Sequence, residues 1–178
     1  MKSLLLVALM VSISQAFACK CSETWTVRES FKYVPIIISG KVLKRKVVSF
    51  AEMIRTDKLH DIEKDIAGDS QKLKMFEMNF IFEVQFLVTE RFKELNIPDT
   101  ITIYTTITSG SCGFRFEEGK EYIVYGTKKG FYPFMLTEVM KKEMIERENT
   151  YWTTHCTRTQ LYNDLEAKEL RTLRKRME

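Results

Sequence analysis

The placement of four cysteines constrains the fold of this 178-residue chain more than any other feature of the sequence. Cys19 and Cys21 stand near the start, whereas Cys112 and Cys156 lie far along the chain. A bond between Cys19 and Cys21 would strain the disulfide geometry, because a single residue separates them. If the thiols are oxidised, each N-terminal cysteine must therefore bond to a distant one, in either of the two remaining pairings. Each such bond closes a loop on the order of 100 residues, which the chain-entropy model values at about 4–5 kcal/mol.

The first 18 residues predict oxidised thiols, because they have the pattern of a secretory signal peptide. Lys2 precedes an apolar run over residues 4–11, and the Ala-Phe-Ala at 16–18 fits the small-x-small pattern of a cleavage site. The run is too short to span a bilayer, and no later segment is long and apolar enough to do so. We therefore expect residues 1–18 to be removed and residues 19–178 to form a single secreted domain.

Two alternatives concern the same cysteines. In bacterial lipoproteins the cysteine directly after the cleavage point is lipidated, and Cys19 would then anchor the chain to the cell envelope. Such signals usually carry Leu three residues before the cysteine, where this chain has Ala16, so ordinary cleavage is favoured. A Cys/His metal site that includes His155 would need reduced thiols, which an oxidising compartment disfavours.

Composition and motifs narrow the classes of function. A hydrophobic fraction of 44% is enough for one packed core. The net charge of +4 is modest and, without a clustered basic face, does not indicate a nucleic-acid partner. No motif surrounds a serine nucleophile, and no glycine-rich phosphate loop is present. We expect a monomer that is not an enzyme, has no cofactor or metal of its own and does not bind nucleic acid.

Alternating apolar residues predict five β-strands. The clearest run covers residues 76–88, in which every second residue from Phe76 to Val88 is apolar. The other strands are expected at 36–43, 99–107, 122–125 and 131–136. Five strands at this spacing predict a mainly β domain, either a small antiparallel barrel or a sandwich.

Helical patterns flank these strands. Thr26 and Glu29 have the spacing of a capping box and predict a short helix over residues 26–34. Apolar residues at helical spacing predict a terminal helix after Cys156. The strongly charged stretch 49–71 is interpreted as an elaborated, solvated loop between two strands.

The N-terminus itself has the features of a metal ligand. A mature chain that begins Cys-Lys-Cys, with both cysteines bonded to the core, holds its α-amino group and first carbonyl side by side. A catalytic zinc keeps one coordination position open, which such a bidentate group can occupy. The amine must be neutral, and its ordinary pKa of about 7.7–8.0 makes deprotonation easy near neutral pH. The plainer interpretation is that the cysteines only fasten a loose chain end to the domain.

Three blocks of sequence resemble one family in order and spacing. They are Cys19-x-Cys21 with Ser39-Gly40-Lys41-Val42, then Ser111-Cys112-Gly113-Phe114 with Glu121-Tyr122-Ile123-Val124-Tyr125, then Thr154-His155-Cys156-Thr157-Arg158-Thr159. This series resembles the netrin-like (NTR) module, and it is most similar to the N-terminal domain of tissue inhibitors of metalloproteinases (TIMPs). The similarity spans most of residues 19–178.

The resemblance implies an OB-like five-stranded antiparallel barrel with flanking N-terminal and C-terminal helices. It also implies the pairings Cys19–Cys112 and Cys21–Cys156. In the inhibitors, the residue at the position of Cys19 chelates the zinc of the protease, and the residue at the position of Lys20 enters its specificity pocket. The stretch 49–71 matches a family loop that can touch the protease. The contacts implied for a zinc metalloprotease partner are Lys20, Cys21, Ser22, Glu23, Cys112 and Gly113.

The sequence also departs from the inhibitors. TIMP N-terminal domains carry a third disulfide and precede a cysteine-rich domain, neither of which this sequence contains. Inhibitors usually have a small or uncharged residue where this chain has Lys20. Because an unpaired ammonium is costly to bury, Lys20 favours a protease with an acidic pocket. The alternative function is a non-inhibitory netrin-like protein-binding module, lipid-anchored through Cys19, with a basic cluster over residues 171–176 available to acidic surfaces.

Overall fold

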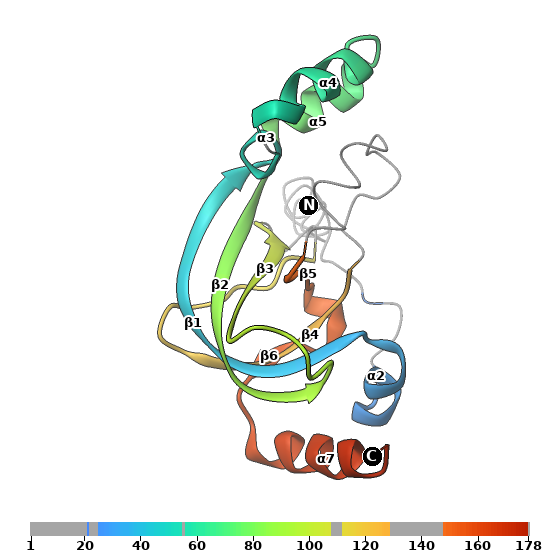
Figure 1. Ribbon diagram of the computed structural model, residues 1–178, viewed down its shortest axis with the longest axis vertical. Helices are drawn as coiled ribbons and strands as arrows, with labels where there is room; N and C mark the ends of the chain where they lie inside the picture. Colours follow the sequence, from blue (N-terminus) through green and yellow to red (C-terminus); the bar gives the residue numbers. More distant parts are fainter. Residues whose placement is uncertain (1–20, 22–24, 55, 108–111, 129–147, 178) are drawn as a thin grey trace, which may run out of the picture.

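The computed structural model describes residues 21, 25–54, 56–107, 112–128 and 148–177 of the chain. This part is mainly β, as the sequence predicts, and its strands form one sheet that curls into half of a barrel (Figure 1). The strands are β1 (Ile36–Ser49), β2 (Phe80–Lys93), β3 (Thr100–Thr106), β4 (Glu121–Gly126), β5 (Thr150–Trp152) and β6 (Gln160–Leu161). Their order across the sheet is β5-β3-β2-β1-β4-β6.

The curl originates in the two longest strands. β1 and β2 each contain 14 residues and pair antiparallel along their whole length. Their register shifts at three places, between Ile37 and Ile38, Ser39 and Gly40, and Val42 and Lys44. An extra residue in one strand of a pair bends that strand and increases its twist. The hairpin therefore wraps around the core instead of lying flat.

Gly40 marks the tightest approach within this hairpin. A Cβ atom at this position would lie 2.9 Å from the carbonyl oxygen of Leu87 and 3.2 Å from the ring of Phe86. A register shift of the β1–β2 pair lies at the same position, between Ser39 and Gly40. Only a residue without a side chain lets the two backbones meet at this distance.

Hydrophobic residues pack on both faces of the sheet. The concave inner face carries Val84, Phe86 and Tyr122, and Phe116 from the segment between β3 and β4 packs on them, its ring edge to face with that of Phe86 at 5.0 Å. On the opposite, outer face, helices α2 (Val27–Tyr33) and α7 (Asp164–Lys175) cover one end of the sheet. Residues of both helices pack on Ile37, Phe92, Ile123 and Tyr125.

The five-stranded antiparallel barrel is correct in class but wrong in detail. Four predicted strands are present, but the strand expected at 76–88 begins only at Phe80, and the strand expected at 131–136 lies outside the described residues. β5 and β6 are additional, and β5 runs parallel to β3. At three and two residues, these strands are too short to show a period in the sequence.

The expectation of a solvated loop at 49–71 is wrong. The segment after β1 forms three helices, α3 (Phe50–Met53), α4 (Thr56–Ile66) and α5 (Ser70–Met78), at one end of the hairpin (Figure 1). Ile62 and Ile66 of α4 are completely buried. They belong to a cluster that covers the outer face at Val48, Ile81, Tyr104 and Trp152. The many charges of this segment lie on the solvent side of the helices and obscured its apolar side in the sequence.

Both flanking helices are present. The Thr26–Glu29 capping box forms as predicted, with the backbone N–H of Thr26 donating to Glu29 at 2.8 Å. These hydrogen bonds lower the pKa of the Glu29 carboxyl below its ordinary value. The terminal helix begins at Asp164, where the Asn163 side chain accepts from the backbone N–H groups of Leu165 and Glu166.

The buried face of α4 supplies the first prediction. Replacing Ile62 by Ala removes a completely buried side chain, so the free energy of unfolding should fall by about 3 kcal/mol. Lys64→Ala, on the exposed side of the same helix, should change it by less than about 0.5 kcal/mol. Urea denaturation of both variants checks this. If both substitutions changed the free energy of unfolding equally, α4 would not pack on the outer face of the sheet.

Candidate functional site

The site predicted from the sequence is the N-terminal ridge and the cysteine segments beside it. Of its residues the structure describes Cys21, Cys112, Gly113 and Cys156. Cys19, Lys20, Ser22 and Glu23 lie outside the described residues. What can be described is therefore the N-terminal platform, by which we mean Cys21 and the residues around Cys112, Gly113 and Cys156 that hold it.

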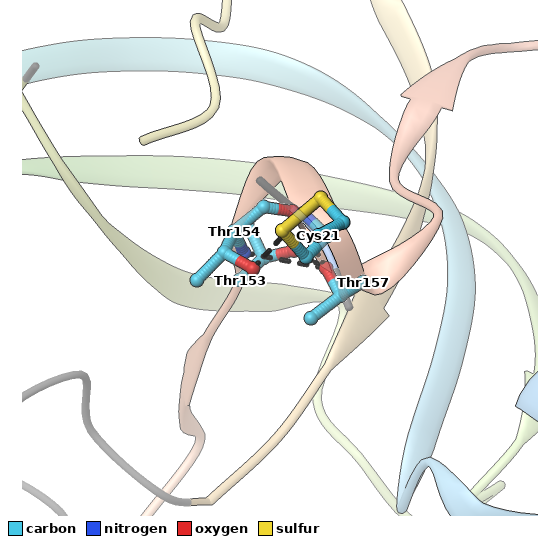
Figure 2. Close-up of a disulfide and its surroundings, with 5 residues drawn as sticks. Cys21, Thr153, Thr154 and Thr157 are labelled. Carbon is cyan, nitrogen blue, oxygen red and sulfur yellow. Dashed lines mark hydrogen bonds between the residues drawn. A yellow bond between two sulfur atoms is a disulfide. The ribbon is translucent and has the colours of Figure 1, made fainter. Parts of the chain in front are cut away.

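A disulfide joins Cys21 to Cys156, with 5.3 Å between the two Cα atoms and 135 residues between the cysteines. This is the pairing that the family resemblance implies. Cys156 lies in the short 3-10 helix η2 (His155–Thr157), which follows β5. Figure 2 shows the sulfur atoms beside Thr154 and Thr157, whose side chains hydrogen-bond to the backbone of the same turn. The N-terminal chain is thus bonded to a turn that has little freedom of its own.

Threonine hydroxyls fix this turn to the sheet. The Thr153 hydroxyl lies 2.6 Å from the hydroxyls of both Thr157 and Thr159, and it donates to the carbonyl oxygen of Tyr125 at 3.1 Å. The backbone N–H of Tyr125 in turn donates to the Thr159 hydroxyl at 3.1 Å. Thr153 and Thr159 are almost completely buried. Because buried hydroxyls that keep their partners give rigid networks, the turn is held at the end of β4.

The Cys112 segment lies directly against the same turn. The backbone N–H of His155 donates to the carbonyl oxygen of Cys112 at 2.7 Å. Two residues after Cys112, the backbone N–H of Phe114 donates to the Thr105 hydroxyl on β3 at 2.8 Å. Cys112 has a left-handed backbone with φ of 60° and is also disulfide-bonded. Its implied partner, Cys19, lies outside the described residues.

Gly113 allows this close packing. A Cβ atom at Gly113 would lie 2.0 Å from the carbonyl oxygen of Thr106 and 2.8 Å from its hydroxyl. No side chain fits at that distance, so the chain can pass over the end of β3 only with glycine here. The Cys112–Gly113 pair and the Cys21–Cys156 disulfide are thereby brought side by side, although more than 40 residues separate Gly113 from Cys156 in the sequence.

Arg158 links Trp25, near the start of the chain, to a buried carboxylate. Arg158 donates two hydrogen bonds to Glu166 of α7, at 2.7 and 3.1 Å, and a third to the carbonyl oxygen of Trp25 at 3.0 Å. Glu166 is 7% exposed and also accepts from the Tyr125 hydroxyl at 2.6 Å. Burial, together with the bond to Glu166, raises the pKa of Tyr125 well above its ordinary value. The hydroxyl therefore stays protonated and keeps donating.

The role of Arg158 could not be predicted from the sequence. The residue stands in the third block of the resemblance, but nothing in the sequence connects it to Trp25 or to Glu166. Trp25 is distant in the sequence from Arg158 and Glu166, and the three meet in the fold, in which α7 packs against α2. Cys21 and Trp25 are consequently both attached to the domain, Cys21 by a covalent bond and Trp25 by a guanidinium.

The alternative of a Cys/His metal site at His155 does not fit this arrangement. Cys112 and Cys156 are both disulfide-bonded, and an oxidised sulfur is not a thiolate ligand. Within the described part of the chain, no group of three or more His, Cys, Asp or Glu side chains is arranged to hold a metal ion. No helix in the same part is long and apolar enough to cross a membrane.

The contact at Gly113 leads to a second prediction. Gly113→Ala should lower the free energy of unfolding by about 1–3 kcal/mol, because the new methyl group overlaps the backbone of Thr106. Gly68→Ala is the matched control, since no atom lies within 4 Å of its Cβ position. It should leave stability unchanged or raise it by up to about 1 kcal/mol. Thermal and urea unfolding compare the two variants, and equal stability would contradict the close contact.

Comparison with known proteins adds one relative. No family model matches the chain. A protein of Margaritifera margaritifera named "NTR domain-containing protein" is 32% identical over 103 residues, which are 56% of this chain. The matched region spans 61% of that relative, so the chain corresponds to about three-fifths of its length. Together with the curled sheet and the Cys21–Cys156 bond, this similarity supports a netrin-like module.

Proposed function

We propose that this chain is a secreted netrin-like module that inhibits a zinc metalloprotease with its N-terminus, in the manner of TIMPs. The observation that carries the proposal is the double attachment of the N-terminal segment, through the Cys21–Cys156 disulfide and through the Arg158–Trp25 hydrogen bond.

The chemistry follows from the position of Cys19, two residues before Cys21. Once the signal peptide is removed, the α-amino group and carbonyl of Cys19 become a bidentate ligand that fills the open position of a catalytic zinc. The partner protease supplies the metal. The bond from Cys21 to Cys156 limits the conformational entropy that the two preceding residues can lose on docking, which strengthens binding. The Cys112–Gly113 segment, beside the disulfide, forms the second part of the contact surface, and Lys20, Ser22 and Glu23 complete it.

Lys20 defines the expected target. As the residue after the chelating cysteine, it enters the specificity pocket of the protease. An ammonium buried there must meet a carboxylate, or the cost of desolvation exceeds the gain from the zinc bond. The proposed target is therefore a zinc metalloprotease with an acidic specificity pocket, rather than one whose pocket is apolar.

The rival function is a netrin-like module that binds another protein without chelation. The relative from Margaritifera margaritifera is named only for its NTR domain, which fits this function equally well. In that case Cys19 carries a lipid or stays unused, and binding tolerates changes at the N-terminus. Intact mass and N-terminal sequencing of the secreted protein separate a free Cys19 from a lipidated one.

An N-terminal extension tests the chelation directly. One extra Ala before Cys19 moves the amino group away from the carbonyl of Cys19 and should abolish inhibition, while thermal unfolding stays unchanged. One extra Ala after Glu178 is the control and should leave inhibition intact. Inhibition constants are measured against a panel of zinc metalloproteases with acidic and apolar pockets. Full inhibition by the N-terminally extended protein would refute the mechanism.

Arg158 is a positioning residue in this proposal, because it holds Trp25 without touching the protease. Arg158→Met should weaken inhibition by about tenfold or more, because it removes the hydrogen bond that holds the carbonyl of Trp25. Arg171→Met is the matched control, since Arg171 forms a similar ion pair with Glu90, at 2.7 Å. Both variants lose a guanidinium–carboxylate pair that involves α7. If they weaken inhibition equally, Arg158 acts only through stability, and its positioning role is wrong.

A further inference from the structure

A pocket of about 360 Å³ opens on the inner face of the sheet, at the edge of the core, against which Phe82 and Phe114 pack. The described residues that line it are Arg45, Phe82, Ile107, Gly113, Phe114 and Arg115. They come from β1, from β2, from the residue directly after β3 and from the segment that crosses between β3 and β4. This volume is in the range of sites that hold small organic molecules.

The curl of the hairpin explains why the pocket exists. The segment that carries Phe114 and Phe116 closes the core, because Phe116 is completely buried against Phe86 and Tyr122. Beyond this segment the hairpin continues, and its inner face is only partly covered. Val47 is 52% exposed and Phe80 is 50% exposed, and both lie on the same face as Phe82. The pocket therefore belongs to an apolar surface that folding leaves open.

Two guanidinium groups stand at this apolar surface. Arg45 lies over the ring of Phe82, with 4.7 Å from its guanidinium carbon to the ring centre. It also donates to the carbonyl oxygen of Phe116 at 2.7 Å, so its position is fixed. Arg115 is exposed, and within the described residues it forms no salt bridge.

No acidic side chain is among the described residues that line the pocket. Glu118 is close by, and its carboxylate accepts from the backbone N–H of Arg45 at 2.7 Å. That bond holds Glu118 at the edge of β1. The lining thus combines aromatic and aliphatic side chains with two guanidinium groups, of which Arg45 is held in place and Arg115 is exposed.

We propose that this pocket binds a small amphipathic anion, with an apolar body against Phe82, Phe114 and Ile107 and an acidic group between Arg45 and Arg115. Apolar side chains alone would bind a neutral molecule equally well. Arg45 is half-buried against the ring of Phe82, so water screens its charge less, and it favours a carboxylate or sulfonate over a neutral group. The site goes beyond the proposed inhibitory function and does not depend on a free Cys19.

The probe for this site is 8-anilinonaphthalene-1-sulfonate, an aromatic anion whose fluorescence rises in apolar surroundings. We expect one bound molecule for each chain. Decanoate should displace it, and decanol, which has the same chain without the charge, should do so at least about tenfold less well. Equal displacement by the two competitors would show that the arginines do not recognise the anion and would overturn the proposal.

Two variants with matched controls locate the binding. Arg115→Gln should weaken binding of the probe by about tenfold, because it removes a charge-assisted contact. Arg176→Gln removes the same charge from the exposed end of α7 and should have no effect. Ile107→Ala should weaken binding several-fold by reducing the apolar wall, whereas Leu165→Ala, at a side chain that is 79% exposed on α7, should not.

The four variants distinguish binding in this pocket from binding elsewhere on the surface. Loss of binding in the Arg115 and Ile107 variants, with both controls unchanged, supports the pocket. Binding that is absent in the unmodified protein, or that all four variants alter equally, overturns it. Because inhibition of a protease is measured separately, failure of this proposal leaves the N-terminal mechanism standing, and failure of that mechanism leaves the pocket standing.

Discussion

The antiparallel pairing of β1 with β2 is the constraint on which the rest of the structure depends. β1 is an inner strand of the sheet, bonded to β2 along its whole length and to β4 over its first half. The register shifts in the β1–β2 pair bend both strands, and the bend gives the sheet an inner and an outer face. Each end of the hairpin then has apolar residues on its outer face. Helices α2 and α7 cover one end, and the three helices between β1 and β2 cover the other.

The N-terminal platform uses the same sheet as its base. Tyr125 on β4 connects the two parts of the platform, because its backbone bonds to the threonine cluster and its hydroxyl bonds to Glu166. The disulfide turn and the Arg158–Glu166 pair are thus fixed to the same residue. This arrangement gives the chain at Cys21 a rigid support without any additional strand. Cys21 and Trp25 are therefore held by the same sheet, one through sulfur and one through a guanidinium.

Most of the fold could be predicted from patterns within single segments. Thr26 and Glu29 predicted α2 because a capping box is a local signal, and Val84, Phe86 and Val88 predicted β2 because its inner face repeats every second residue. The helices after β1 were missed because their many charges hide the few apolar residues, Ile62 and Ile66 among them, that pack inward. Arg158 and the pocket at Phe82 could not be found from the sequence, since each is built from segments that meet only in the folded chain.

The covalent ring closed by Cys21 and Cys156 has a mechanical consequence. The ring contains strands β1 to β5, while β6 and α7 lie outside it. A pull on the residues before Cys21 therefore passes through sulfur to the η2 turn and does not peel β1 from its neighbours. The hydrogen bonds between β1 and its neighbours, which would otherwise break one after another, do not carry this force. A partner that holds the N-terminus can thus exert force on the domain while the strands of the sheet inside the ring stay paired.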